Sequence, residues 1–383
     1  MGVLEIGIPF IRENDNRVQL VSNISENGKS YEIWFEVAKK YGEYLTTERI
    51  DAFFVALLPL AMKNKLDIVS KGVVSEKLYF QTTKFLIPIL SKYSKNFDSI
   101  KIDIENKSNA CINTQGENAT GFSRGVDSFD TVNDILNNGD FSLTHLTFFN
   151  VGSHKSSSGY TPEQSRALYE KRLNVSKESS KIINLPLVDV NSNLGEHLVL
   201  DYVKIHHFCS FSAVLALQKF FKNYYYSSGY PISDFSIKKC DKGSAFYEPI
   251  LSNMLSTEST TFHITGLDKT RLEKVNSISN YQPSYDNLNV CFYSEGNCGK
   301  CEKCIRTQLE LYALGKLELY KGSFDVDSFY SNMDKYIDYM LKHQNQIAYK
   351  EILQQMEKSN IKLTTIQQIK KAVYGIAIKV LKK

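Results

Sequence analysis

The chain has 383 residues, of which 42% are hydrophobic and 23% charged, and its formal net charge is +4. This composition is typical of a soluble globular protein, and so small a charge gives no general signal for nucleic-acid binding, although a local basic patch stays open. The N-terminus lacks a basic leader, and the most apolar run, 52–62, is too short to cross a bilayer. We therefore expect a cytoplasmic protein.

The first 117 residues have the pattern of an N-terminal α/β domain, whose role the sequence does not indicate. Neither a cluster of His or Cys nor a Gly-rich turn occurs there, and the polar stretch 105–117 is typical of a linker. Alternating and helical periodicities predict strands at 4–8, 31–35 and 101–104 and helices at 47–63 and 79–93.

From residue 118 onward, strands alternate with helices, which predicts a parallel sheet with right-handed crossovers. Thr161-Pro162-Glu163-Gln164 fits a capping box, so a helix is expected from there to about residue 180. Expected strands lie at 119–122, 143–149 and 182–190, and a long apolar helix is expected at 208–226. This domain is predicted to span 118–320, and a C-terminal helical segment 321–383, with helices at 328–341, 344–356 and 365–383.

Ser123-Arg124-Gly125-Val126-Asp127-Ser128 lies between an expected strand and an expected helix. The first N–H groups of such a helix have no partners inside it and carry the positive end of the helix dipole, which suits a phosphate. Gly125 permits close approach, the two serines can donate hydroxyl hydrogen bonds, and Asp127 can cap the helix or face a phosphate-bound magnesium ion. Taken alone, so short a segment is more often an ordinary capped turn.

Four cysteines lie within 14 residues at Cys291, Cys298, Cys301 and Cys304. Four thiolates that leave no open position are typical of a structural tetrahedral zinc site. An iron–sulfur cluster is the main alternative, but the ferredoxin pattern requires a further cysteine before a proline, and none follows.

The loop and the cysteines together resemble the PP-loop (N-type) ATP pyrophosphatases, and in particular 7-cyano-7-deazaguanine synthases and their uncharacterised relatives with an N-terminal extension. The resemblance covers roughly 119–315 and includes the phrase 297–304, Asn-Cys-Gly-Lys-Cys-Glu-Lys-Cys. It implies an α/β fold with a parallel HUP/PP-loop (Rossmann-like) sheet, ATP with Mg²⁺ and structural Zn²⁺, and an AMP-forming ligase. Such an enzyme adenylates a small carboxylate and transfers it to ammonia or an amine, giving an amide or nitrile.

The resemblance also implies functional residues. Val126 and the other five residues of the loop would bind the nucleotide phosphates, and Asp127 would act in catalysis together with Lys274 and Arg271, which are spaced on one face of an expected helix. Asn150 and Gly152 would contact the adenosine, because ligands bind beyond the carboxyl ends of the strands. Arg124 replaces the glycine usual in the family; we expect it to contact the pyrophosphate, and the alternative is that it closes the pocket.

Other interpretations stay open. The enzyme could instead transfer sulfur to a nucleobase or tRNA, or the chain could be a degenerate nucleotide sensor. A protein or peptide acceptor and a homodimer are further partners to consider. We expect the apolar face of the last helix to pack on the protein, with weak contact with an anionic membrane surface as the alternative. His206, His207 and Cys209 are expected to be packing residues, and Glu258 is either a ligand or a surface carboxylate.

Overall fold

The computed structural model describes residues 2–138, 142–154, 161–291 and 293–381. These residues form two compact units. Unit 1 comprises 1–122 and 135–267, and unit 2 comprises 123–134 and 268–383. We describe each unit by itself.

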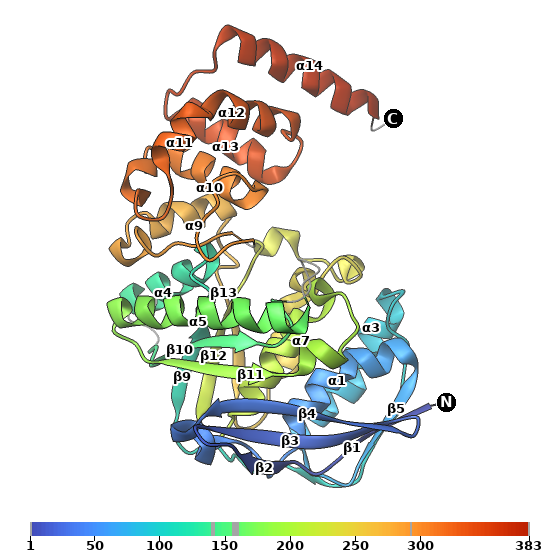
Figure 1. Cartoon of the computed structure of the whole chain (residues 1–383). Helices are drawn as coiled ribbons and strands as arrows, with labels where there is room; N and C mark the ends of the chain where they lie inside the picture. The colour runs from blue at the N-terminus through green and yellow to red at the C-terminus, as the bar shows by residue number, and fades with distance from the viewer. Residues whose placement is uncertain (1, 139–141, 155–160, 292, 382–383) are drawn as a thin grey trace. The chain divides into compact units, whose positions relative to one another are not determined.

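Unit 1 is built on one mixed sheet (Figure 1), which has eleven strands among the described residues. Most neighbouring strands are parallel, and the antiparallel pairs involve the N-terminal strands. In sheet order the strands are β13 (Thr261–Thr265), β12 (Phe221–Ser227), β9 (Glu117–Gly121), β10 (His145–Asn150), β11 (Leu187–Ser192), β4 (Lys29–Ala38), β3 (Arg17–Glu26), β1 (Gly2–Ile6), β5 (Leu66–Ser70) and β7 (Ile102–Ile104), while β2 (Phe10–Glu13) pairs with β3.

The sheet is continuous across the expected linker at 105–117. β4 pairs antiparallel with β11, with Asn191 opposite Glu36, and Arg17 forms an ion pair with Asp189 at 2.8 Å. A small two-stranded sheet of β6 (Val74–Ser75) and β8 (Lys107–Ser108) lies at the start of that stretch. The N-terminal strands and the strands after residue 117 therefore share one sheet and one hydrophobic core.

Helices pack on this sheet. The capping box at Thr161 is present, since the Thr161 hydroxyl accepts from the Gln164 N–H and the Gln164 side chain accepts from the Thr161 N–H. The helix that it starts, α5, packs against β10 and β11, and α1 packs on α7. The bounds are α1 (Asp51–Asn64), α2 (Glu76–Gln81), a π-helical turn (Thr82–Leu86), α3 (Ile87–Tyr93), α5 (Pro162–Ile183), α6 (Leu194–His197), α7 (Tyr202–Leu215) and α8 (Glu248–Met254).

The long helix expected at 208–226 is wrong. The helix α7 starts earlier, capped by Asp201, and ends at Leu215, and 221–227 form the strand β12 between β9 and β13. The helix α7 and the strand β12 are both rich in apolar and aromatic residues, so their composition hid the change of period. The aromatic run Tyr224-Tyr225-Tyr226 is the feature that favours a strand. The strand expected at 182–190 likewise begins only at Leu187, because α5 continues to Ile183.

Unit 2 is helical. It contains the loop 123–125, the beginning of α4 (Val126–Asn138), the cysteine-containing segment and the C-terminal helices. Gly315 ends α10 at φ 68°, a conformation that glycine adopts without strain. The remaining helices are α9 (Arg271–Ile278), α10 (Glu302–Ala313), α11 (Val326–Ser331), α12 (Met333–Lys342), α13 (Ile347–Lys358) and α14 (Thr365–Leu381).

The protein thus has an α/β fold with a large mixed, mostly parallel sheet and C-terminal helices. Within the described ranges, none of the helices has the length and hydropathy that a bilayer-spanning segment requires.

Candidate functional site

The loop at 123–128 joins β9 to the first turn of α4 and is folded by its own polar groups. The Gly125 N–H donates to the Ser123 hydroxyl at 3.3 Å, and the Ser128 hydroxyl donates to the Gly125 carbonyl at 3.0 Å. Val126 is buried, whereas Ser123 is exposed. The buried valine anchors the turn, and the Ser123 side chain stays accessible to a ligand.

Asp127, in the first turn of α4, forms ion pairs with two cations of α9. Arg271 Nη1 lies 3.3 Å from one carboxylate oxygen and Lys274 Nζ lies 3.5 Å from the other. Burial opposes ionisation, but Arg271 and Lys274 lower the pKa of the Asp127 carboxyl below its usual value. The three residues that the resemblance assigned to catalysis therefore lie together in unit 2, although they are far apart in the sequence.

Three residues of α10, Lys303, Arg306 and Glu310, extend this cluster and were not predicted from the sequence. Glu310 is 1% exposed and lies 3.5 Å from Arg271 Nε and 3.7 Å from Arg306 Nε. Burial and the neighbouring Arg271 and Arg306 lower the pKa of Lys303 to about 8, and Asp127 partly opposes this shift. The available signal was the spacing of Lys303, Arg306 and Glu310, which puts the three on adjoining positions of one helix.

Several cations surround the Asp127 carboxylate. Arg271, Lys274 and Lys303 act on it electrostatically, and Arg271 and Arg306 pair with Glu310. Lys274 also interacts with Asp130, and Lys303 with Cys301. Burial raises the pKa of Glu310, and the neighbouring Arg271 and Arg306 oppose this shift. Three cations beside the first turn of α4 favour an anionic ligand at that helix N-terminus.

Lys269 links α4 to the segment before α9. Its ammonium group lies 3.1 Å from Asp130 and 3.1 Å from Asp134, both on α4. One cation does not fully neutralise two carboxylates, and Asp130 also interacts with Lys274.

Arg124 adopts φ 61°, the left-handed conformation that favours glycine. Its side chain is buried, with its guanidinium 3.4 Å from the Glu295 carbonyl, and its own carbonyl accepts from the Asn289 N–H at 2.8 Å. The backbone geometry gives a physical reason why glycine suits this position. The guanidinium is directed to the segment before Cys298, so the expected phosphate contact stays a prediction.

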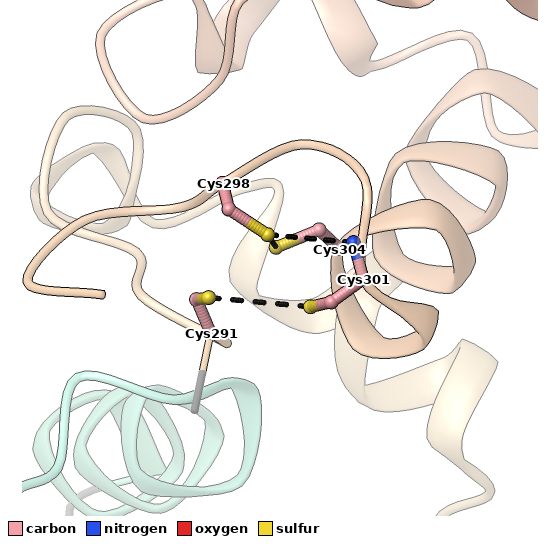
Figure 2. A group of neighbouring side chains, drawn as sticks. All are labelled: Cys291, Cys298, Cys301 and Cys304. Atoms are coloured by element: carbon pink, nitrogen blue, oxygen red, sulfur yellow. Dashed lines mark hydrogen bonds between the residues drawn. The ribbon is translucent and has the colours of Figure 1, made fainter. Parts of the chain in front are cut away.

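The four cysteines predicted to bind metal converge (Figure 2), and their sulfur atoms all lie within 4.8 Å of one another. The Cys298–Cys304 and Cys291–Cys301 sulfur distances are 3.9 and 4.0 Å. Tetrahedral zinc with Zn–S bonds of about 2.3 Å requires sulfur–sulfur distances of about 3.8 Å. The four residues therefore fit a structural zinc ion.

Local donors orient these sulfurs. Cys291 Sγ accepts from the Tyr293 N–H at 3.4 Å and the Ser294 hydroxyl at 3.2 Å, and Cys298 Sγ accepts from the Cys301 N–H at 3.3 Å. Burial opposes ionisation of Cys291, but these donors lower its pKa to about 6. Donors directed at sulfur stabilise the thiolate form, which is the form that binds metal.

In unit 1, a cavity of about 520 Å³ lies beyond the carboxyl ends of β10 and β11. Gly152, at φ 110°, lines it, and a side chain there would contact Tyr202 and the backbone of Gly195. Asn150 instead donates to Asn191 at 2.8 Å within the sheet. Of the two residues expected to contact adenosine, Gly152 is at the cavity and Asn150 links neighbouring strands.

The residues expected to pack do so. His207 is buried between Ser244, at 2.7 Å, and Glu248, at 2.9 Å, and burial raises the pKa of the Cys209 thiol to about 12. Glu258 is a structural carboxylate, because it accepts from Arg49 at 3.2 Å and from the Ser75 hydroxyl at 2.6 Å.

Searches with this chain against protein-family models, curated proteins and solved structures returned no match.

Proposed function

We propose that this protein is an ATP-dependent, AMP-forming enzyme of the PP-loop type, with a Rossmann-like HUP arrangement of its parallel strands. The observation that carries the proposal is the group of three cations, Arg271, Lys274 and Lys303, around Asp127, directly after a serine- and glycine-containing loop at a helix N-terminus. Such an arrangement suits the pyrophosphate part of ATP, which carries several negative charges. The resemblance to 7-cyano-7-deazaguanine synthases supplies the reaction class.

In the proposed reaction, a carboxylate oxygen of a small substrate attacks the α-phosphorus of ATP. The bond from that phosphorus to the bridging oxygen breaks, and pyrophosphate leaves with the electron pair. Ammonia or an amine then attacks the carbonyl carbon of the acyl-adenylate, AMP leaves, and the nitrogen loses a proton to water. A nitrile would require a second activation of the amide by another ATP.

The residues of the cluster have electrostatic roles in this scheme. Arg271 and Lys274 neutralise charge that develops on the leaving pyrophosphate, and the N–H groups at the start of α4 hold its oxygens. A bound Mg²⁺ would neutralise further phosphate charge, with Asp127 as the ligand that this chain offers. The residues of the cluster orient and stabilise, so the scheme requires no nucleophilic side chain of the protein.

The unit 1 cavity, taken by itself, has a mostly apolar lining around Gly152, with Val151, Leu198 and Ile205 among its members, which suits a small organic ligand. Sulfur transfer is the less favoured reaction. It requires a reactive thiolate, whereas burial raises the pKa of Cys209 and the four clustered cysteines fit a metal ion.

The proposal is tested by incubating the full chain with ATP, Mg²⁺, ammonium and a pool of small carboxylic acids. We expect AMP and pyrophosphate in equal amounts, with an amide or nitrile product detected by mass spectrometry. Release of ADP and phosphate would overturn the assignment, and ATP binding without any turnover would favour the nucleotide sensor.

A matched pair of variants separates the cluster from general surface charge. Lys274→Gln removes a cation whose side chain is 2% exposed, whereas Lys321→Gln removes one that is 66% exposed. We expect the first to lower turnover at least 100-fold and the second to leave turnover unchanged. Equal activity of both variants would exclude the cluster as the phosphate site.

A further inference from the structure

The last helix, α14, packs on unit 2 through its polar side. Gln367 Nε2 donates to Asp334 at 2.9 Å, and Lys370 and the Tyr374 hydroxyl lie 2.9 and 3.1 Å from Asp338. Both aspartates belong to α12, beside which α14 lies (Figure 1). The polar contacts of this helix are therefore directed inward.

The apolar side of α14 is exposed. The row i, i+3, i+7, i+10 places four aliphatic residues on one face of the helix. Their exposed fractions are 68% for Ile366, 59% for Ile369, 54% for Val373 and 65% for Ile376. The expectation that this face packs on the protein is wrong for these four residues, because the helix is held by its opposite side.

The charge of the segment is as distinctive as its exposed face. Residues 362–383 contain six lysines and no acidic residue, a net charge of +6, whereas the whole chain carries +4. The remaining residues therefore carry −2. Two of the six lysines, Lys370 and Lys371, pair with Asp338 and Glu357 of unit 2. Lys382 and Lys383 lie outside the described residues.

We infer that α14 binds an anionic lipid surface, with its four aliphatic residues inserted among the headgroups and the lysines towards its two ends, Lys362, Lys379, Lys382 and Lys383, attracted to the anionic lipids. Pairing of α14 with a second copy is disfavoured, since it would bring the lysines of two acid-free segments together, and only Lys370 and Lys371 of each have acidic partners among the described residues. A polyanion such as nucleic acid matches the lysines but gives the aliphatic row no partner. A lipid surface satisfies both features, and this inference is independent of the proposed enzymatic function.

The test is co-sedimentation of the full chain with vesicles of phosphatidylcholine alone and with 30% phosphatidylserine, at low and physiological salt. We expect binding to the anionic vesicles that is at least tenfold stronger than to the neutral ones and that weakens as salt rises. Equal binding to both vesicles, or to neither, would overturn the inference.

Two variants and a control identify the segment. The double variant Ile369→Ser, Val373→Ser keeps every charge and should lose vesicle binding at least tenfold. The triple variant Lys379→Gln, Lys382→Gln, Lys383→Gln keeps the aliphatic row and should lose tenfold or more, because each lysine near an anionic surface contributes about fivefold. A charge-matched control replaces three exposed lysines of unit 1 by glutamine, at Lys84, Lys92 and Lys101.

The control should bind as the wild type does. If the serine variant also retains full binding, attraction is purely electrostatic and the inserted row is refuted. If instead the serine variant converts a dimer to a monomer in analytical ultracentrifugation and vesicle binding is absent from the wild type, the face is a self-association surface and the lipid inference fails.

Discussion

Asp127→Asn is the most informative single change in the cation cluster. The carboxylate lies 3.3 Å from Arg271 and 3.5 Å from Lys274, and the Lys274 side chain is 2% exposed. At an effective dielectric of about 20, each pair has a Coulomb energy of roughly 5 kcal/mol before solvation. Because a third of the Asp127 side chain is exposed to water and asparagine still accepts a hydrogen bond, we expect the free energy of unfolding to fall by about 2 kcal/mol.

The same change should alter anion binding in a way that depends on magnesium. Without Mg²⁺, pyrophosphate should bind about tenfold more tightly to the variant, since a unit charge within about 10 Å of a phosphate repels it by roughly 1.7 kcal/mol or more. With Mg²⁺, the wild type should gain affinity and the variant should gain little, because it lacks the carboxylate ligand. Urea unfolding and isothermal titration calorimetry measure the two effects, in magnesium-free buffer without chelators so that the cysteine site keeps its metal.

Asp134→Asn is the matched control on the same helix. Its side chain is 37% exposed, close to the 33% of Asp127, but its partner Lys269 also pairs with Asp130. The free energy of unfolding of this control should fall by well under 1 kcal/mol, and its affinity for pyrophosphate should equal that of the wild type. If Asp127→Asn matches this control in stability and in pyrophosphate affinity, the cluster is a structural ion-pair network and the phosphate-site reasoning is refuted.

Three further predictions concern the loop, the cysteines and a buried histidine. In urea unfolding, the Arg124→Gly variant should be more stable than the Arg124→Ala variant by about 1 kcal/mol. Both variants lack the guanidinium, but only alanine is strained at φ 61°. Equal stabilities would contradict the left-handed geometry. Metal analysis of the purified protein should find one zinc ion per chain. The Cys304→Ser variant should lose this zinc and about 3 kcal/mol or more of unfolding free energy, whereas Cys111→Ser, which replaces an exposed thiol, should keep its zinc. Iron in place of zinc would refute the assignment. Burial and the neighbouring Arg172 lower the pKa of His154 to about 3. Below pH 6.5 the unfolded state therefore binds a proton at this histidine that the folded state does not bind. As a result, the free energy of unfolding falls as the pH drops from 6.5 towards 3. His154→Phe should remove this loss, which amounts to roughly 2 kcal/mol between pH 7 and 5, and an unchanged pH dependence would show that His154 is protonated in the folded protein.

Local signals predicted the parts of the fold that depend on neighbouring residues. The capping box at Thr161 and the glycine at 315 fix a helix start and a helix end through contacts within a few residues, and both are present. The cysteine spacing likewise places four sulfurs on one short segment, and they converge. In each case the interacting residues lie within 14 residues of sequence or fewer.

Features that depend on partners far away in the chain could not be predicted from the sequence. Nothing near Asp189 indicates that its partner is Arg17, or that β11 pairs with β4. Lys303 looks like a spacer between two cysteines until α10 is placed beside α9. The apolar row of α14 shows the opposite failure, because an amphipathic pattern predicts which residues share a face but not which face is turned inward.

The pairing of β4 with β11 has a consequence for how the chain is synthesised. Glu36 is opposite Asn191, 155 residues later, so β4 leaves the ribosome about 8–30 s before its partner at ordinary elongation rates. During that interval, one edge of β4 has no partner strand and can pair with other nascent chains. β4 carries Glu32 and Glu36 among the apolar and aromatic residues that follow Lys29 and Ser30, and such charges oppose pairing between two copies. Replacing Glu32, whose ion pair with Arg12 is largely exposed, with valine should therefore increase aggregation during synthesis far more than it changes the stability of the finished protein.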